Sequence, residues 1–314
     1  MNPIFSDIFD GNLFDNNITN GLGSDDLIVL DNGNDTSNGG AGNDLIYGYG
    51  GKDTLVGGAG IDTLNGGDGN DVITSDGDGG TYRGDGGNDT LSSGLGNETM
   101  DGGTGTDTID HTIFAGNYVF NMATGLTNFG GESFINFENA NMGAGNDSVT
   151  GNASANIING GAGNDTLEGG FGQDTLTGGA GNDFFRLTEV SFISLPPGPA
   201  NPQSRDLITL FSVADDTIIL ADSLDSSFAF SPGAITGLSF VGGNVPGNVL
   251  NAGSFFKGSG EDGRPLGKAS GIYVNTLDGN IWYNNSTAAG SYLIANVAPT
   301  AALAMTNADF VYGL

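Results

Sequence analysis

The sequence contains no cysteine and few basic residues, and each shortage narrows the range of possible functions. Lysine and arginine supply 7 of the 314 residues against 37 aspartates and glutamates, so the net charge at pH 7 is -30. Such a charge makes nucleic acid and anionic membrane surfaces unsuitable partners. It also makes a compact chain repel itself unless cations neutralise it. The absence of cysteine fits a cytosolic chain and an extracellular one equally.

Histidine and long apolar runs are scarce as well. The single histidine, His111, excludes a His-Glu-x-x-His zinc site, and no Gly-x-Ser-x-Gly elbow is present. We interpret His111 as an ordinary edge residue rather than a catalyst. No stretch reaches the about 18 apolar residues of a membrane span, so no span is expected. Residues 1–12 lack the basic and apolar regions of a cleavable signal peptide, which by itself suggests a cytoplasmic protein.

Glycine, by contrast, is abundant and periodic. It supplies 58 residues, and the nine-residue pattern Gly-Gly-x-Gly-x-Asp-x-U-x, with U apolar, repeats in one frame over residues 39–110. The pattern returns over residues 142–186. Upstream, residues 30–38 keep the frame, whereas residues 20–28 keep the pattern but are interpreted as displaced by one inserted residue. A period of this length is typical of a stacked-coil solenoid whose loops bind calcium.

Each unit joins a glycine-rich loop to a short strand. Glycine permits a positive φ, so a loop such as residues 39–44 can turn its carbonyl oxygens inward. Calcium prefers about six to eight hard oxygen ligands, so one aspartate per loop is too few and a second loop must complete the shell. The last residues of a unit, such as Thr54, Leu55 and Val56, place one apolar residue between two others. This alternation predicts a short strand with one face inward.

Two units form one coil of about 18 residues, and successive coils stack at about 4.8 Å like strands of a parallel sheet. Aspartates 18 positions apart then become neighbours that share calcium ions, of which about seven or eight are expected. In the first block these aspartates are Asp35, Asp53, Asp71, Asp89 and Asp107 on one side, and Asp44 and Asp62 on the other, where Gly80 and Glu98 interrupt the row. Asp25, in the displaced unit, is a further predicted ligand. In the second block they are Asp147, Asp165 and Asp183 on one side and Asp174, which follows Asn156, on the other.

These units resemble the haemolysin-type calcium-binding nonapeptide repeats of the RTX family over residues 20–186. The resemblance implies an all-β fold, a right-handed parallel β-roll. It also implies that each aspartate binds calcium together with backbone carbonyls of the first and third loop positions, and of the second and fourth positions on the next coil. Carried over by position, it implicates Gly39, Ala41, Gly57, Ala59, Gly66, Asp68, Gly160, Ala162, Gly178 and Ala180.

The chain is divided into a capping coil (1–19), a first repeat block (20–110), irregular β-roll coils (111–141), a second block (142–186) and a small C-terminal β cap (187–314). Prolines at 196, 197, 199 and 202 predict a loop. Strands are predicted at 206–211, 216–220, 271–275 and 280–284, the last two joined by a hairpin turn at 276–279. Residues 305–314 are similar to uncleaved type I secretion signals, so an exporter is an expected partner.

The expected function is that of a secreted calcium-binding protein that folds outside the cell, with a structural, surface-layer or matrix role that includes self-association. No catalysis is expected, because the repeats begin near residue 20 and leave no room for a preceding catalytic domain. A non-catalytic module that binds glycans or surfaces is the alternative. The aromatic residues Phe255, Phe256, Trp282 and Tyr283 fit either the core of the cap or a sugar- or subunit-binding surface.

Overall fold

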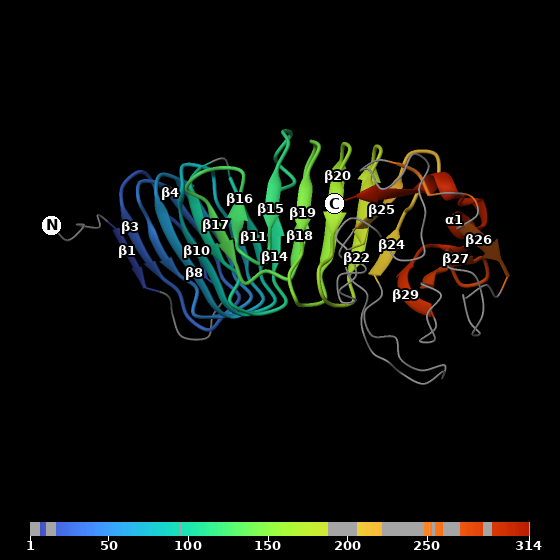
Figure 1. The fold of residues 1–314 in the computed structure, drawn as a ribbon. Coiled ribbons are helices and arrows are strands. Elements are labelled where there is room, and N and C mark those ends of the chain that lie inside the picture. Colours follow the sequence, from blue (N-terminus) through green and yellow to red (C-terminus); the bar gives the residue numbers. More distant parts are fainter. Residues whose placement is uncertain are drawn as a thin grey trace. The chain divides into compact units, whose positions relative to one another are not determined.

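The regular structure of the described residues is almost entirely short β-strand, most of it paired in parallel (Figure 1). The computed structural model describes residues 7–10, 17–94, 96–187, 206–221, 248–250, 252, 255–259, 271–284 and 291–313. Two compact units are present, unit 1 over residues 1–144 and unit 2 over residues 145–314. The predicted loop around the four prolines and parts of the capping coil lie outside the described residues.

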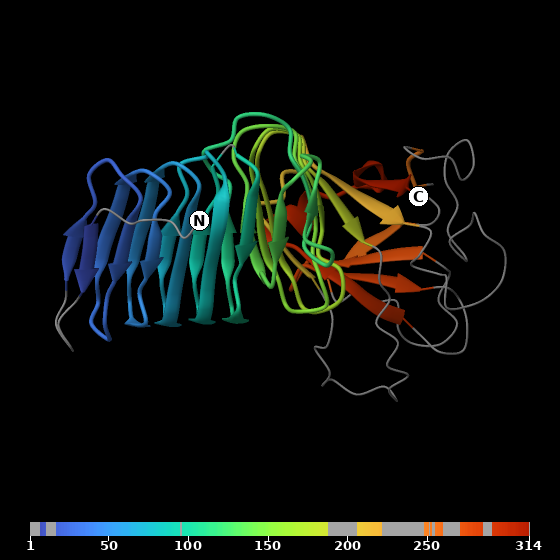
Figure 2. The ribbon, with the colours of Figure 1, turned by 90° about the vertical axis from the view of Figure 1, so that its left-hand side faces the viewer.

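Unit 1 is a parallel β-solenoid with two principal sheets, whose strands lie side by side in Figure 2. The first contains β1 (Asp7–Asp10), β3 (Asp26–Val29), β5 (Leu45–Tyr47), β8 (Asp62–Gly69), β10 (Gly80–Gly87), β12 (Glu98–Asp101) and β17 (Ser133–Ile135). The second contains β2 (Ile18–Asn20), β4 (Thr36–Ala41), β7 (Thr54–Ala59), β9 (Val72–Thr74), β11 (Thr90–Ser92), β14 (Thr108–Asp110) and β18 (Asn139–Asn141). Short strands complete the unit: β6 (Gly50–Gly51) and β13 (Thr104–Gly105) at the loops, and the antiparallel pair β15 (Val119–Asn121) and β16 (Leu126–Thr127).

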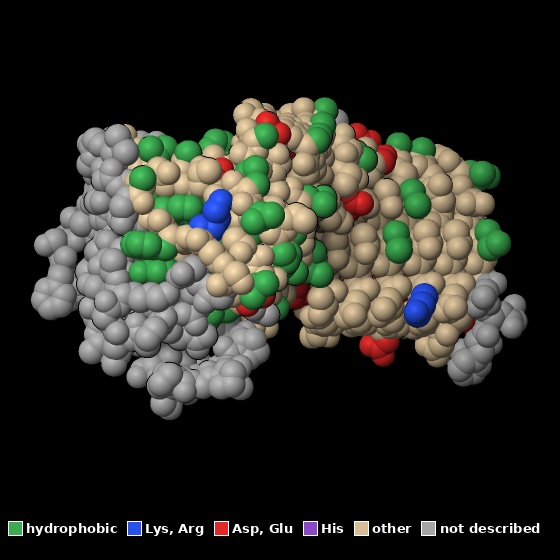
Figure 3. Space-filling view, turned by 90° about the vertical axis from the view of Figure 1, so that its right-hand side faces the viewer, with side chains coloured by type: hydrophobic (Ala, Val, Ile, Leu, Met, Phe, Trp, Pro, Cys, Tyr) green, Lys and Arg blue, Asp and Glu red, His purple; other side chains and the backbone are tan. Residues whose placement is uncertain are grey.

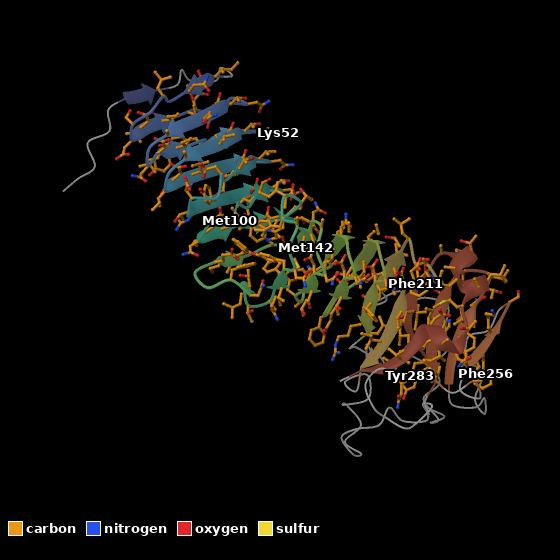
Figure 4. The ribbon with its side chains drawn as sticks, turned by 90° about the horizontal axis from the view of Figure 1, so that it is seen from above. Lys52, Met100, Met142, Phe211, Phe256 and Tyr283 are labelled. Carbon is orange, nitrogen blue, oxygen red and sulfur yellow. The ribbon has the colours of Figure 1, made fainter. Side chains whose placement is uncertain are left out.

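The register follows the predicted coil of two repeat units. Leu27 pairs with Leu45, and Ile46 pairs with Leu64, so one step of the sheet equals two nonapeptides. The apolar residue of each unit points inward because strand side chains alternate between faces. The inner rows of the two sheets are fully buried and consist of Ile28, Ile46, Leu64, Tyr82, Met100 and Phe134 on one side and Leu55, Ile73, Leu91, Ile109 and Ala140 on the other. Met100 lies in this core in Figure 4, whereas the exposed Lys52 lies in an outer loop.

Unit 2 also consists largely of stacked parallel strands, and this stack extends past the last repeat. One sheet contains β19 (Ser148–Thr150), β21 (Thr166–Glu168), β23 (Phe184–Leu187), β25 (Thr217–Ala221) and β30 (Phe310–Gly313). The other contains β20 (Ile157–Ala162), β22 (Thr175–Ala180), β24 (Asp206–Thr209), β29 (Ser291–Asn296), β28 (Asn280–Asn284), β27 (Gly271–Asn275) and β26 (Phe255–Gly258). Strands β24 and β25 pair in parallel with β22 and β23, so two predicted strands extend the solenoid beyond Arg186.

The C-terminal part of unit 2 adds an antiparallel hairpin to the solenoid. Strands β27 and β28 are antiparallel, which confirms the predicted turn between them, and Gly279 in that turn has φ +75°. The short helix α1 (Pro299–Ala304) and the 3-10 turn η3 (Asn307–Asp309) lead into β30. None of the helices in the described part of the chain has the length and apolarity needed to cross a membrane.

His111 lies in an aromatic cluster inside unit 1, so its interpretation as an edge residue is wrong. Its side chain is fully buried. The ring lies 4.6 Å from that of Tyr118 and 5.2 Å from that of Phe134, with Phe114 and Phe120 nearby. Neither ring nitrogen has a hydrogen-bond partner among the described residues. Burial therefore lowers the pKa of His111 to about 3 and keeps the ring neutral.

Replacing His111 by phenylalanine is predicted to stabilise unit 1. An unsatisfied buried polar group costs about 1–3 kcal/mol, and a phenyl ring has none. The gain should grow as pH falls through about 6.5, because unfolded histidine binds a proton that the buried ring cannot hold. Denaturant unfolding of wild type and His111→Phe in excess calcium, at pH 7.5 and 5.5, checks this. Equal pH dependence in both proteins contradicts it.

Candidate metal centre

A row of buried aspartates follows one side of unit 1 and forms what we call the long ladder. Its members are at most 1 % exposed and are Asp35, Asp53, Asp71, Asp89 and Asp107. Each lies at the end of a glycine loop, immediately before a strand. The pairing of that strand therefore also fixes the position of the aspartate side chain. One carboxylate oxygen, Oδ1, accepts the backbone N–H of the aspartate one coil earlier, at 2.8 Å in each step from Asp35 to Asp107. The predicted pairs are therefore neighbours.

The opposite side of unit 1 carries a short ladder of Asp26, Asp44 and Asp62. The N–H of Asp26 donates to Asp44 Oδ1 and that of Asp44 to Asp62 Oδ1, both at 2.8 Å. The one-residue displacement expected for residues 20–28 is wrong, because β3 pairs with β5 in the same register as later coils. Asp26, and not Asp25, therefore occupies the ladder position. Asp25 is half-buried at the preceding position, where its Oδ1 accepts the N–H of Asn43.

Gly80 and Glu98 interrupt the short ladder, as the sequence predicts. Gly80 has no carboxylate, and Glu98 folds its own carboxylate into the protein, where it is fully buried. Its oxygens accept hydrogen bonds from the Ser93 hydroxyl, at 2.7 Å, from the Gly94 N–H and from the Ser75 hydroxyl. Three protein donors thus satisfy Glu98 without a cation.

Unit 2 contains two ladders that run further than the repeats. Asp147 N–H donates to Asp165 Oδ1 at 2.8 Å, and Asp165 N–H donates to Asp183 Oδ1 at 3.0 Å. On the other side, Asn156 N–H donates to Asp174 Oδ1 at 2.8 Å.

Three residues that the repeat pattern misses extend the ladders of both units. Each accepts the N–H of the last ladder aspartate: Glu138 for Asp107, Asp206 for Asp174 and Asp216 for Asp183. The Asp-x-apolar sequences at Asp206 and Asp216 are the signal that could have identified the last two.

The second carboxylate oxygen of the ladder aspartates is the feature that points to a cation. Oδ2 is buried and has no hydrogen-bond partner among the described residues in Asp44, Asp53, Asp62, Asp71, Asp89, Asp107, Asp165, Asp174 and Asp183. A buried charge without a partner costs several kcal/mol, so such oxygens require a positive ion or a proton. Lysine and arginine supply only 7 residues of the chain, and they are sparse on the face shown in Figure 3.

The first glycine of each loop creates the space beside Oδ2. A Cβ on Gly48 would collide with Asp53 Oδ2 and with the carbonyl oxygen of Gly66 on the next coil. A Cβ on Gly84 would likewise collide with Asp89 Oδ2 and the Gly102 carbonyl. A carboxylate and a backbone carbonyl from successive coils therefore point into one cradle. Hard oxygens of these two kinds are the ligands that calcium prefers, so the donor set fits calcium.

The carbonyls implicated by the RTX resemblance fall into two groups. First-position carbonyls approach the cradles: those of Gly57, Gly66 and Gly178 lie near the Cβ positions of Gly39, Gly48 and Gly160. Third-position carbonyls connect coils, because those of Ala59, Ala162 and Ala180 accept the N–H of a loop glycine one coil earlier at 2.7–2.8 Å. A carbonyl has two lone pairs, so this hydrogen bond leaves room for a second interaction.

The asparagine before the ladder aspartate binds the following coil, whereas the aspartate binds the preceding coil. Asn88 Oδ1 accepts the N–H of Thr106 on the next coil at 3.0 Å, whereas Asp89 Oδ1 accepts the N–H of Asp71 on the previous coil. Asn70 Oδ1 binds the N–H of Asn88 in the same way. The Asn-Asp dipeptide therefore connects its coil to both neighbours. The asparagine contacts carry no charge and do not depend on a cation.

Few carboxylates lie close together at any one point of these rows. Among the described residues no three His, Cys, Asp or Glu side chains converge on one point, so carbonyls must supply the other ligands. Burial, together with the neighbouring carboxylates, raises the pKa of Asp53 to about 7 against the opposing hydrogen bond from Asp35 N–H. Burial likewise raises the pKa of Asp62, Asp89, Asp107 and Asp165 to about 6.

Comparison with known proteins identifies a family of calcium-binding repeats. The model of the RTX calcium-binding nonapeptide repeat, spanning four copies, matches residues 10–46, 30–64, 47–82, 76–109, 143–167 and 163–187. A search of curated proteins finds no match. The matched segments cover the long ladder and the repeat-derived part of the ladders in unit 2.

In the absence of calcium, the folded form is predicted to be favoured by acid. The folded pKa values near 6 and 7 exceed the unfolded value of about 3.9, so folding takes up protons. This contribution is complete below pH about 4 and is lost as pH rises through 6 to 7. His111, whose pKa burial lowers, opposes this contribution. Far-UV circular dichroism in chelator should show more β structure at pH 5 than at pH 8, and a signal independent of pH contradicts the prediction.

Proposed function

We propose that this chain, which carries RTX calcium-binding nonapeptide repeats, is a secreted protein whose β-roll folds when calcium binds outside the cell. The observation that carries the proposal is the set of buried Oδ2 atoms that lie beside a glycine cradle and have no hydrogen-bond partner among the described residues. Calcium supplies the missing partner. Because the site exists only when two coils stack, the free energy of binding is also free energy of folding.

Low calcium should keep the chain unfolded at neutral pH. The ladder carboxylates would have to be buried as unpaired anions one coil apart, and the glycines lose much backbone entropy on folding. Extracellular calcium near the millimolar range saturates sites of the weak class, with dissociation constants of about 10⁻⁴ to 10⁻³ M. The chain can therefore remain unfolded in the cytosol and fold outside.

The C-terminal segment supports export in the unfolded state. Residues 305–314 resemble type I secretion signals, yet in the folded protein Phe310 is fully buried and β30 pairs with β25. An exporter could bind this segment only before unit 2 folds. Low intracellular calcium would keep the segment accessible.

The described surface favours a non-catalytic role. Almost every buried aspartate belongs to a ladder, and His111 is enclosed by aromatic rings, which leaves it unable to reach a substrate. We therefore propose a structural, surface-layer or matrix component that associates laterally. The partly exposed Phe256, stacked on Tyr273 with ring centroids 4.6 Å apart, supports the second candidate, a glycan-binding module.

Calcium is predicted to drive folding through the cradle aspartates. Far-UV circular dichroism of the full chain should gain β signal between micromolar and tens of millimolar calcium, and magnesium should not substitute, because it demands octahedral geometry. Asp89→Asn keeps an acceptor for the Asp71 N–H but loses the charged Oδ2, so its calcium midpoint should rise several-fold. The matched control is Asp278→Asn, which removes an exposed carboxylate in the β27–β28 turn, keeps an acceptor for the Asn280 N–H and should shift the midpoint little. No β gain with calcium would refute the proposal.

Self-association is predicted to depend on calcium. Size-exclusion chromatography and negative-stain electron microscopy at high protein concentration should show assemblies with calcium and monomers in chelator. A folded monomer at every concentration contradicts the matrix role. A glycan screen then decides whether Phe256→Ala abolishes binding, with the loop variant Leu277→Ala as an exposed control.

A further inference from the structure

We propose a further calcium site at the end of the long ladder, built outside the nonapeptide repeats by Gly102, Asp107, Asn136 and Glu138. The proposal rests on the calcium binding proposed above and extends it to a coil that lacks the repeat pattern. Residues 133–141 contain no glycine and no aspartate, so neither the pattern nor the family match, which ends at residue 109 here, assigns a site to them.

A shortened loop faces the last regular loop of the ladder. Asp101 pairs with Ile135 and Thr108 pairs with Asn139, so both ends of the two loops are in register. Between these ends the regular loop contains the six residues 102–107, whereas the facing loop contains only Asn136, Phe137 and Glu138. The fully buried Phe137 side chain anchors the short loop to the core.

Asn136 brings a carbonyl to the position that glycine carbonyls occupy elsewhere. Its φ of +58° lies in the left-handed region, which asparagine tolerates better than most residues. A Cβ on Gly102 would collide with the Asn136 carbonyl oxygen and come within 3.0 Å of Asp107 Oδ2. The cradle of Gly48 and Gly84 is thus rebuilt with a carbonyl from a different sequence.

Asp107 Oδ2 supplies the unmatched charge in this cradle. Asp107 is fully buried, and its Oδ2 has no hydrogen-bond partner among the described residues. Its Oδ1 is already used by the N–H of Asp89 at 2.8 Å. The remaining oxygen therefore faces the Asn136 carbonyl in a space that only a cation or a proton can satisfy.

Glu138 takes the position of the next ladder aspartate. Its Oε2 accepts the N–H of Asp107 at 2.9 Å, as Asp Oδ1 does at other steps, and its own N–H donates to the Asp107 carbonyl at 3.1 Å. The additional methylene of glutamate lets the carboxylate reach across from the shorter loop. Calcium accepts irregular oxygen shells, so this altered geometry remains suitable for it.

The ladder of Asp147, Asp165 and Asp183 in unit 2 ends differently from the long ladder. There Asp216 accepts the N–H of Asp183 at 3.0 Å with one oxygen and the N–H of Ser212 at 2.8 Å with the other. Both of its oxygens have protein donors, so this terminal residue needs no cation.

Asp183 Oδ2 is also buried without a hydrogen-bond partner among the described residues, but the three atoms nearest to a Cβ on Gly178 all belong to Asp183. At the Asp107 end, by contrast, the atom nearest to a Cβ on Gly102 is the Asn136 carbonyl oxygen of the next coil, which makes this end the stronger candidate.

The test counts the calcium ions bound by the folded full chain. Glu138→Gln keeps an acceptor for the Asp107 N–H but removes the charge, so native mass spectrometry at saturating calcium should show one ion fewer than in wild type. The matched control is Asp110→Asn, which removes a nearby outward carboxylate that accepts the Thr112 N–H. That control should bind the wild-type number of ions.

Equal ion counts and affinities in wild type and Glu138→Gln overturn this site while leaving the other sites intact. No binding by wild type overturns the proposed function as well. Should Glu138→Gln fail to reach the wild-type circular dichroism signal in calcium, crystals of the wild-type protein soaked in terbium decide the matter. An anomalous peak between Asp107 Oδ2 and the Asn136 carbonyl supports the site. Peaks at the Gly84 cradle without one here refute it.

Discussion

The structure depends on a carboxylate shared between two stacked coils. One oxygen of each ladder aspartate accepts a backbone N–H from the coil before it and so fixes the register. The other oxygen faces the carbonyl of the coil after it and has no donor. Alignment and charge are thus inseparable, because the hydrogen bond that holds the coils together also buries an anion. A calcium ion bound between the two oxygens would remove this conflict, and its binding free energy would then stabilise the stacked coils.

Other residues of the nonapeptide follow from the same constraint. The first glycine must lack a side chain because the carboxylate and the carbonyl fill the space of its Cβ. The asparagine side chain accepts an N–H from the following coil, and the aspartate side chain accepts one from the preceding coil. Two adjacent side chains thus connect a loop to both of its neighbours. The apolar residue then fills the narrow interior. Since every loop repeats these contacts, a solenoid can lengthen one coil at a time, and its stability is a sum over neighbouring coils.

Much of this arrangement was predictable from the periodicity, and the exceptions share one cause. The parallel coils, the pairing of aspartates two units apart and the break at Gly80 all follow from a constant period. The periodic pattern does not identify Glu138, Asp206 and Asp216, because their loops differ in length from the repeat loops. No fixed spacing therefore connects them to the previous aspartate. Asp26 was misassigned since two adjacent aspartates fit the pattern and only strand register separates them. The burial of His111 depends on aromatic contacts formed by an irregular coil, which no period encodes.

The two sides of unit 1 consequently differ in their need for calcium. On the short ladder, the position after Gly80 belongs to Glu98, whose oxygens bind two serine hydroxyls and an amide, so this coil can close without an ion. The long ladder has no such substitution between Asp35 and Asp107. Each of its coils therefore remains incomplete until a cation arrives. The coils of Asp44 and Asp62 on the short side keep buried Oδ2 atoms without a hydrogen-bond partner among the described residues, so the difference is confined to the coil of Glu98. Since both sides belong to the same coils, closing this one coil would bring its opposite loop into register and lower the entropy that calcium binding must overcome there.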